Sequence, residues 1–130
     1  METLQELREK YNNIIKEQNA IYKKIVKLEQ QEVTNNFRVG ECYLSTYCES
    51  FQKIVAVDKN VLNCIVIHSE NIQRDFYYLN DTKYWKKITS KQFKDIYLAV
   101  LRDIQDPDLE NKNKSNWDIV SESIINSLNK

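Results

Sequence analysis

An apolar side chain recurs at alternating steps of three and four residues between positions 4 and 28. This spacing places the side chains along one side of an α-helix, and no glycine or proline interrupts the segment. An apolar seam of this kind requires a partner, and we expect a second copy of the chain first. The predicted self-association seam consists of Leu4, Leu7, Tyr11, Ile14, Gln18, Ile21, Ile25 and Leu28.

The same helix has an alternative, which is to fold back and pack on its own domain. A helix of about 30 residues spans roughly 45 Å, more than a small domain can cover, so self-association is favoured. Ile15 and Tyr22 widen the stripe at flanking positions, so one edge can contact the domain while the seam pairs with another chain. Gln18 at a core position lowers stability but can determine the register. The seam leaves open the helix orientation and the number of chains, although we favour a dimer.

Length and charge limit the classes of protein that remain. The chain has 130 residues, enough for one modest domain beside the long helix. Nineteen basic residues balance 19 acidic ones, so no net charge attracts nucleic acid or an anionic membrane. No window of 18 apolar residues indicates a membrane span, and the N-terminus lacks a secretory signal pattern. We therefore expect a cytoplasmic protein, in which Cys42, Cys48 and Cys64 are buried, reduced thiols.

After residue 35 the pattern changes to the two-residue period of β-strands. Asp58-Lys59-Asn60 separates two runs rich in Val and Ile, which predicts a hairpin. The run from Val61 is apolar at almost every position, so we expect a central strand covered on both faces. Short connections predict that neighbours in sequence pair in an antiparallel meander that can curl into a half-barrel. The five predicted strands span residues 37–47, 51–57, 61–68, 72–79 and 84–88.

Two further helices follow the strands. Thr89 with Gln92, and Ser115 with Asp118, have the spacing of capping boxes at helix N-termini. The segment between these helices contains the only proline and few apolar residues, which predicts a solvated linker. The fold class is therefore α+β, with a long coiled-coil-type helix (1–34), a β meander and its packing helix (35–104), a linker (105–115) and a C-terminal helix (116–130).

The sequence gives little support for a catalytic site or a metal site. His68 is the only histidine and has no nucleophile signature around it, and Gly40 is the only glycine, which excludes phosphate-binding loops. Cys64 and His68 lie four apart on a predicted strand, hence about 13 Å apart. A zinc ion needs each ligand atom within about 2.3 Å, so these two residues cannot share an ion. We expect a protein that is not an enzyme and holds no metal or cofactor.

Residues 74–94 combine aromatic side chains with lysines and contain no acid from residue 83 onward. Aromatic faces interleaved with cations bind single-stranded nucleic acids, and tyrosine, tryptophan and arginine also dominate protein–protein contacts. The alternative to a binding role is a structural one. The rings would then pack as ordinary strand residues, and the lysines would form a solvated face. The candidate partner-binding residues are Arg74, Tyr77, Tyr84, Trp85, Lys86 and Lys87.

The amino-acid composition resembles that of a known group of proteins. One glycine and one proline in 130 residues, with many Asn, Lys, Ile and Tyr, indicate coding biased toward A and T. In this respect the chain resembles the small accessory proteins of phages and mobile elements of A+T-rich bacteria. The resemblance implies a non-enzymatic inhibitor of a host defence protein, in the manner of anti-CRISPR proteins, acting in the host-cell cytoplasm. The alternatives are a binder of single-stranded nucleic acid or a nucleotide signal, and a structural protein that acts by oligomerisation.

Overall fold

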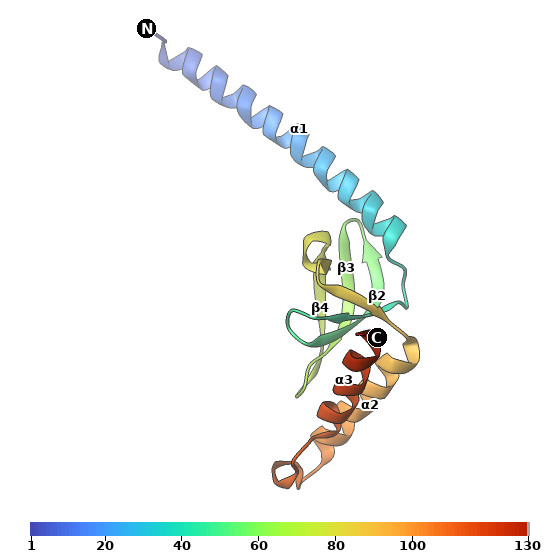
Figure 1. The fold of residues 1–130 in the computed structure, drawn as a ribbon. Helices are drawn as coiled ribbons and strands as arrows, with labels where there is room; N and C mark the ends of the chain where they lie inside the picture. Colours follow the sequence, from blue (N-terminus) through green and yellow to red (C-terminus); the bar gives the residue numbers. More distant parts are fainter. Residues whose placement is uncertain (130) are drawn as a thin grey trace.

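A computed structural model describes residues 1–129 and shows an α+β architecture, as the sequence predicts (Figure 1). A long N-terminal helix leads into a five-stranded antiparallel sheet, and two helices follow. Two short 3-10 helices, η1 and η2, lie in connections. The elements are α1 (Leu4–Asn36), β1 (Cys42–Ser45), β2 (Ser50–Asp58), β3 (Val61–Ile67), β4 (Ile72–Tyr78), η1 (Leu79–Thr82), β5 (Trp85–Ile88), α2 (Ser90–Gln105), η2 (Leu109–Asn111) and α3 (Asn116–Leu128).

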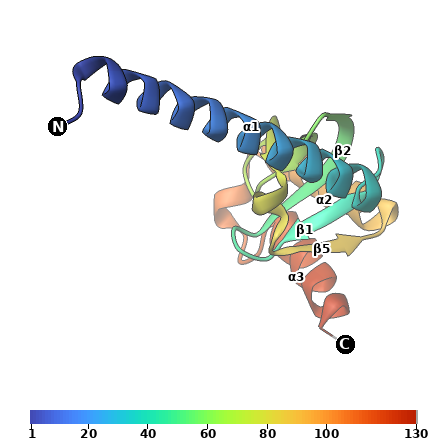
Figure 2. The ribbon, with the colours of Figure 1, turned by 90° about the horizontal axis from the view of Figure 1, so that it is seen from above.

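Helix α1 projects well beyond the rest of the molecule (Figures 1 and 2). Its 33 residues correspond to about 50 Å. The Thr3 side chain accepts a hydrogen bond from the Glu6 amide at 3.2 Å and caps the N-terminus. At the other end, the Phe37 amide donates to the Val33 carbonyl at 2.9 Å before the chain turns away. The helix therefore continues two residues past the boundary predicted at residue 34.

The sheet has the strand order β4-β3-β2-β1-β5. The prediction of a simple meander is correct for the first four strands and wrong for the last, because β5 pairs with β1 rather than with β4. The turn η1 follows β4 and carries the chain across to the other edge. The edges curl toward each other, since the rings of Tyr77 on β4 and Trp85 on β5 lie 5.1 Å apart. The result is an unclosed half-barrel.

The predicted first strand is shortened to four residues. The segment before it forms a tight turn, in which the Glu41 amide donates to the Arg38 carbonyl at 3.2 Å. Gly40 has a positive φ of 94°, a backbone conformation that residues with a Cβ rarely adopt. The Gly40 amide also donates to the Ile54 carbonyl at 2.7 Å and ties the turn to β2. A turn therefore replaces the strand predicted for residues 37–41.

Two apolar clusters lie on opposite faces of the sheet, and β3 contributes to both, as its continuous apolar run predicts. The first cluster joins the sheet to α2 and α3, which both cover the same face. The second cluster lies inside the curl and is covered at one end by Val33 in the last turns of α1. The side chains buried in the second cluster are Val33, Tyr43, Ile54, Leu62, Cys64 and Val66.

The predicted linker contains η2 and is closed by a contact that the sequence pattern does not show. Asp103, near the end of α2, is only 4% exposed. Its two carboxylate oxygens accept from the backbone amides of Asn116 at 2.9 Å and Trp117 at 2.8 Å, at the start of α3. This contact holds the two helices together at the linker. No helix within residues 1–129 combines the length and hydrophobicity that crossing a membrane would need.

Candidate functional site

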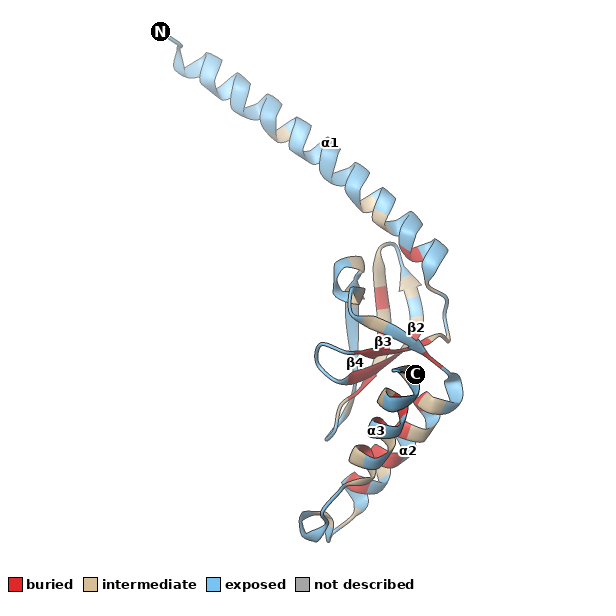
Figure 3. Ribbon diagram, viewed as in Figure 1, coloured by how far each residue is buried: buried red, intermediate tan, exposed pale blue. Residues whose placement is uncertain are grey.

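The first candidate site is the seam of α1, which its own domain leaves uncovered (Figure 3). The seam residues are exposed, and their large apolar members range from 46% exposure at Ile25 to 64% at Leu4 and Tyr11. Val33, near the helix end, is the one residue of α1 that is buried. The flanking Ile15 is half-buried, whereas Tyr22 is exposed. The seam is thus presented to solvent over nearly its whole length.

The second candidate site is an open hollow at the curled end of the sheet, with a volume of about 300 Å³. The loop between β1 and β2 forms one wall, and η1 with the start of β5 forms the other. We call this site the aromatic hollow. Its residues are Tyr47, Gln52, Tyr77, Asp81, Tyr84 and Trp85, with Ser45, Cys48 and Asn80 completing the lining.

Aromatic rings dominate this hollow. Tyr47 and Tyr84 stack with ring centroids 5.8 Å apart and an interplanar angle of 20°, and both are exposed. Tyr77 and Trp85 meet edge to face at 5.1 Å and are half-buried. Trp85 also packs on Tyr43, with centroids 5.4 Å apart, which connects the hollow to the second apolar cluster. The inner rings are therefore held in place, and the outer pair is accessible.

A buried amide lies among the lining side chains of the aromatic hollow. Gln52 on β2 has no exposed surface. Its Nε2 donates to the Ser50 hydroxyl, but its Oε1 has no hydrogen-bond partner among the described residues. An unpaired buried acceptor is costly, so a ligand that donates a hydrogen bond to it gains affinity.

The structure brings together three of the six predicted partner-binding residues. Tyr77, Tyr84 and Trp85 all line the aromatic hollow. Arg74 lies on β4 at the opposite parity from Tyr77 and therefore faces the other side of the sheet. Tyr47, Gln52 and Asp81 were not predicted as site residues. They come close to the three predicted residues only because the sheet curls.

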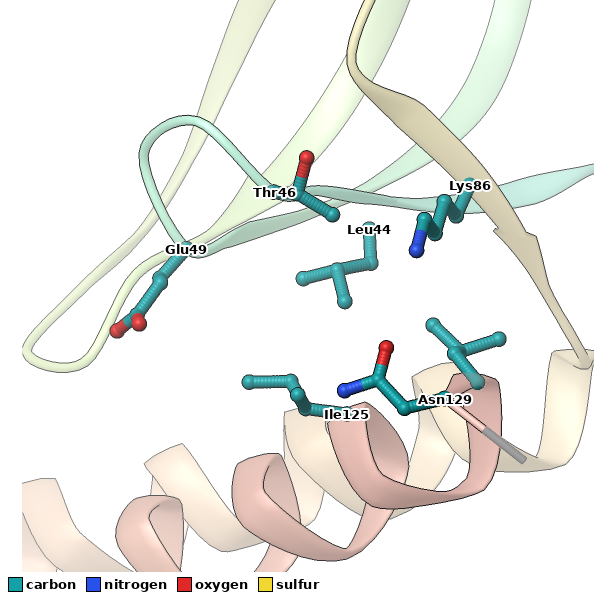
Figure 4. Close-up of a pocket in the computed structure, with 7 residues that line it drawn as sticks. Leu44, Thr46, Glu49, Lys86, Ile125 and Asn129 are labelled. Atoms are coloured by element: carbon teal, nitrogen blue, oxygen red, sulfur yellow. The ribbon is translucent and has the colours of Figure 1, made fainter.

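The two predicted lysines of β5 lie elsewhere. Lys86 lines a cavity of about 100 Å³ between β1 and α3, together with Leu44 and Ile125 (Figure 4). Lys87 forms an ion pair with Glu41. Among the other lysines of this stretch, Lys83 lies over the Tyr84 ring, 5.6 Å from its centroid. The lysines of this run are spread over several faces.

The phenols of Tyr43 and Tyr77 predict a loss of stability at high pH. Burial raises the pKa of Tyr43 and of Tyr77 to about 12, and burial likewise raises the pKa of the Cys64 thiol to about 12. The unfolded chain therefore loses these protons first. The free energy of unfolding, measured with urea, is expected to decline from about pH 9, where an unfolded thiol ionises, and more steeply between about pH 10 and 12. Combining Tyr43→Phe with Tyr77→Phe should remove the steeper part; an unchanged slope would contradict this assignment.

The cysteines differ from their predicted burial in one case. Cys42 and Cys64 are buried, but Cys48 is exposed in the loop between β1 and β2 and lines the aromatic hollow. Burial raises the pKa of the other two thiols, which keeps them protonated and unreactive near neutral pH. Iodoacetamide at pH 8 is expected to modify Cys48 alone in the folded protein and all three thiols in urea. Mass spectrometry of proteolytic fragments would check this, and labelling of Cys42 at the same rate would contradict it.

The geometry defines an α+β domain that carries a projecting helix with an open apolar seam and an aromatic hollow. No family model, no curated protein and no solved structure was found to match this chain. Within residues 1–129, no group of three or more His, Cys, Asp or Glu side chains is placed to hold a metal ion.

Proposed function

We propose that this chain is a non-enzymatic binding protein that forms a homodimer through α1 and presents its globular domain to another macromolecule. The observation that supports this most directly is the position of the apolar seam, which projects into solvent and is not covered by the sheet. Large exposed apolar surfaces on a protein mark sites of association.

The polar residue of the seam favours two parallel helices. In a parallel, in-register pair, each Gln18 lies opposite the partner subunit's Gln18, and the two amides can hydrogen-bond to each other. In a fully overlapped antiparallel pair, Gln18 would instead lie opposite the partner subunit's Ile14. That arrangement would bury an amide against an apolar side chain, which costs free energy.

The charges that flank the seam favour the same orientation. In the parallel pair, Lys24 lies beside the partner subunit's Glu29, and no two like charges meet across the flanking positions. In the antiparallel pair, Lys10 would meet the partner subunit's Lys24, and Glu17 would meet the partner subunit's Glu17. Parallel association therefore gains an attraction and avoids two repulsions. It also places both globular domains at the same end of the helical stem.

Size-exclusion chromatography with light scattering over a wide concentration range tests the dimer. The expected mass is twice the 15.6 kDa of the chain, and a monomer at every concentration would contradict the proposal. The orientation is tested with Ile25→Cys in a Cys48→Ser background. In a parallel dimer the two introduced thiols face each other and oxidise to a covalent dimer. In the antiparallel dimer they would be separated by about 27 Å, and Ile25→Cys would cross-link to Leu7→Cys instead.

The amino-acid composition is the basis for proposing which kind of partner the globular domain binds. An inhibitor of a host defence protein, acting in the host-cell cytoplasm, is the concrete form that the resemblance to phage accessory proteins supports. Such an inhibitor would lose activity through some surface substitutions that leave the dimer intact. A structural protein that acts only by oligomerisation would lose function with the dimer alone. These two classes of variant distinguish the proposals.

The two exposed rings of the aromatic hollow support a second candidate, a protein that binds single-stranded nucleic acid or a nucleotide signal. Tyr47 and Tyr84 provide exposed ring surface on which a base can stack. Binding through phosphates would weaken steeply as salt is raised. Titration with single-stranded oligonucleotides at low salt, followed by a panel of cyclic nucleotides, tests this candidate, and the absence of binding to both would exclude it.

A further inference from the structure

The aromatic hollow has the chemistry of a cation site rather than of a simple apolar depression. Tyr47 and Tyr84 form one stacked pair, and Tyr77 and Trp85 form a second, edge-to-face pair. The faces of aromatic rings carry partial negative charge and attract organic cations, most strongly on tryptophan. Four such rings around one hollow form a recognised arrangement for holding an ammonium group.

Two acceptor groups add to the rings. Asp81 on η1 lines the hollow, and its Oδ2 accepts a hydrogen bond from the Tyr78 amide at 2.8 Å, which fixes the carboxylate. Gln52 lines the hollow as well and has a buried, unpartnered Oε1. A carboxylate favours a positive ligand, and an unpaired acceptor favours a ligand with an N–H donor.

The positive side chains nearby do not line this hollow. Lys83 lies over the Tyr84 ring but is not part of the lining, and Lys86 and Lys87 lie at other sites. Asp81 is the charged residue of the lining. An anionic ligand such as a nucleotide would therefore place its phosphate near a carboxylate without a lysine in the lining to balance it.

We propose that the aromatic hollow binds an alkylammonium group that carries at least one N–H, the group at the end of a lysine side chain. Rings of the lining contact the cation, Asp81 balances its charge, and an N–H donates to Gln52 Oε1. This site lies in the globular domain, so it does not depend on association through α1.

The test is an NMR titration of the full chain, labelled with ¹⁵N, using n-butylammonium at neutral pH. The indole signal of Trp85, assigned by its loss in Trp85→Phe, is expected to shift with a millimolar dissociation constant. Trp117 is buried in the other apolar cluster and serves as an internal control. Butyrate and butanol have similar chains without the positive charge and are expected to leave the Trp85 signal unchanged.

One ligand analogue and three variants test the separate parts of the site. Butyltrimethylammonium, which lacks an N–H, is expected to bind about tenfold more weakly, because Gln52 Oε1 remains unpaired. Asp81→Asn keeps an oxygen for the Tyr78 amide and is expected to weaken butylammonium binding about fivefold. Asp108→Asn removes an exposed acid outside the hollow and is expected to change nothing. Lys83→Gln is expected to strengthen binding, because it removes a positive charge beside Tyr84.

Several results would overturn the proposal. Equal shifts with butanol would show that the hollow recognises only apolar chains. Unchanged binding in Asp81→Asn would show that the carboxylate has no part in the site. A stronger response to adenosine monophosphate that increases further in Asp81→Asn would assign the rings to base stacking. Each of these results leaves the mass of the dimer unaffected, so failure here is distinguishable from failure of self-association.

Discussion

Replacing Ile14 and Ile21 together by aspartate is expected to convert the dimer into a monomer. Both side chains project from the solvent-exposed seam of α1, where they are 53% and 57% exposed. In a dimer each would meet its counterpart, so aspartate would bring carboxylates together within an apolar interface. Burying an unpaired charge costs several kcal/mol in proteins, and about 3 kcal/mol already lowers affinity by more than a hundredfold.

A matched control is available on the same helix. Asn12→Asp with Asn19→Asp introduces the same charge at the same seven-residue spacing, but on the side away from the seam. Light scattering should give a monomer for the isoleucine variant and a dimer for the asparagine variant. Circular dichroism should also show less helix in the isoleucine variant, because a long exposed helix without tertiary packing is only marginally stable. A dimer that persists in the isoleucine variant would place the interface elsewhere.

Replacing Asp103 by alanine is expected to lower the free energy of unfolding by about 3 kcal/mol. The carboxylate accepts from two backbone amides at the start of α3, at 2.9 and 2.8 Å, and is buried. Hydrogen bonds to a charged acceptor are stronger than neutral ones, and a carboxylate at a helix N-terminus is further stabilised by the helix dipole. Alanine would leave both amides without their acceptor.

Two comparisons separate this contact from a general effect of charge. Asp103→Asn retains one acceptor oxygen and is expected to cost about half as much. Asp95→Ala, on the same helix, removes only a surface ion pair with Lys91 and should cost less than about 1 kcal/mol. Urea unfolding provides these values. Near-ultraviolet circular dichroism should change with Asp103→Ala, because Trp117 packs edge to face on Phe51 at 5.3 Å. A loss below about 1 kcal/mol for Asp103→Ala would show that α3 docks independently of this contact.

Features that depend on neighbours in sequence were predictable. The helical period placed α1 correctly, and the turn between β2 and β3 follows from Lys59 and Asn60, with Lys59 at a positive φ of 55°. Thr89 and Ser115 cap their helices as predicted, since the Thr89 hydroxyl accepts from the Gln92 amide at 3.0 Å and the Ser115 hydroxyl from the Asp118 amide at 3.1 Å. Periodicity and capping act over three to seven residues, so the sequence contains the whole signal.

The candidate site was predictable only in part. Tyr77, Tyr84 and Trp85 were predicted to bind a partner because they are aromatic and lie near lysines in the sequence. In the structure the lysines do not line the hollow. Alternation along a strand shows that Trp85 and Lys86 face opposite sides of the sheet. It does not show on which of these sides Tyr47 or Gln52 will lie. Their positions depend on the curl that brings β4 and β5 together.

The sequence by itself determined a projecting amphipathic helix, antiparallel strands with a tight hairpin and two capped helices. The tertiary structure alone decided that β5 pairs with β1, that Asp103 accepts from the first amides of α3, and that four rings line one hollow with Gln52 and Asp81. These contacts join residues far apart in the chain. Their free energy comes from burial and hydrogen bonding that arise only once the elements have packed together, and no local pattern of residues encodes how the sheet curls or how α2 and α3 meet.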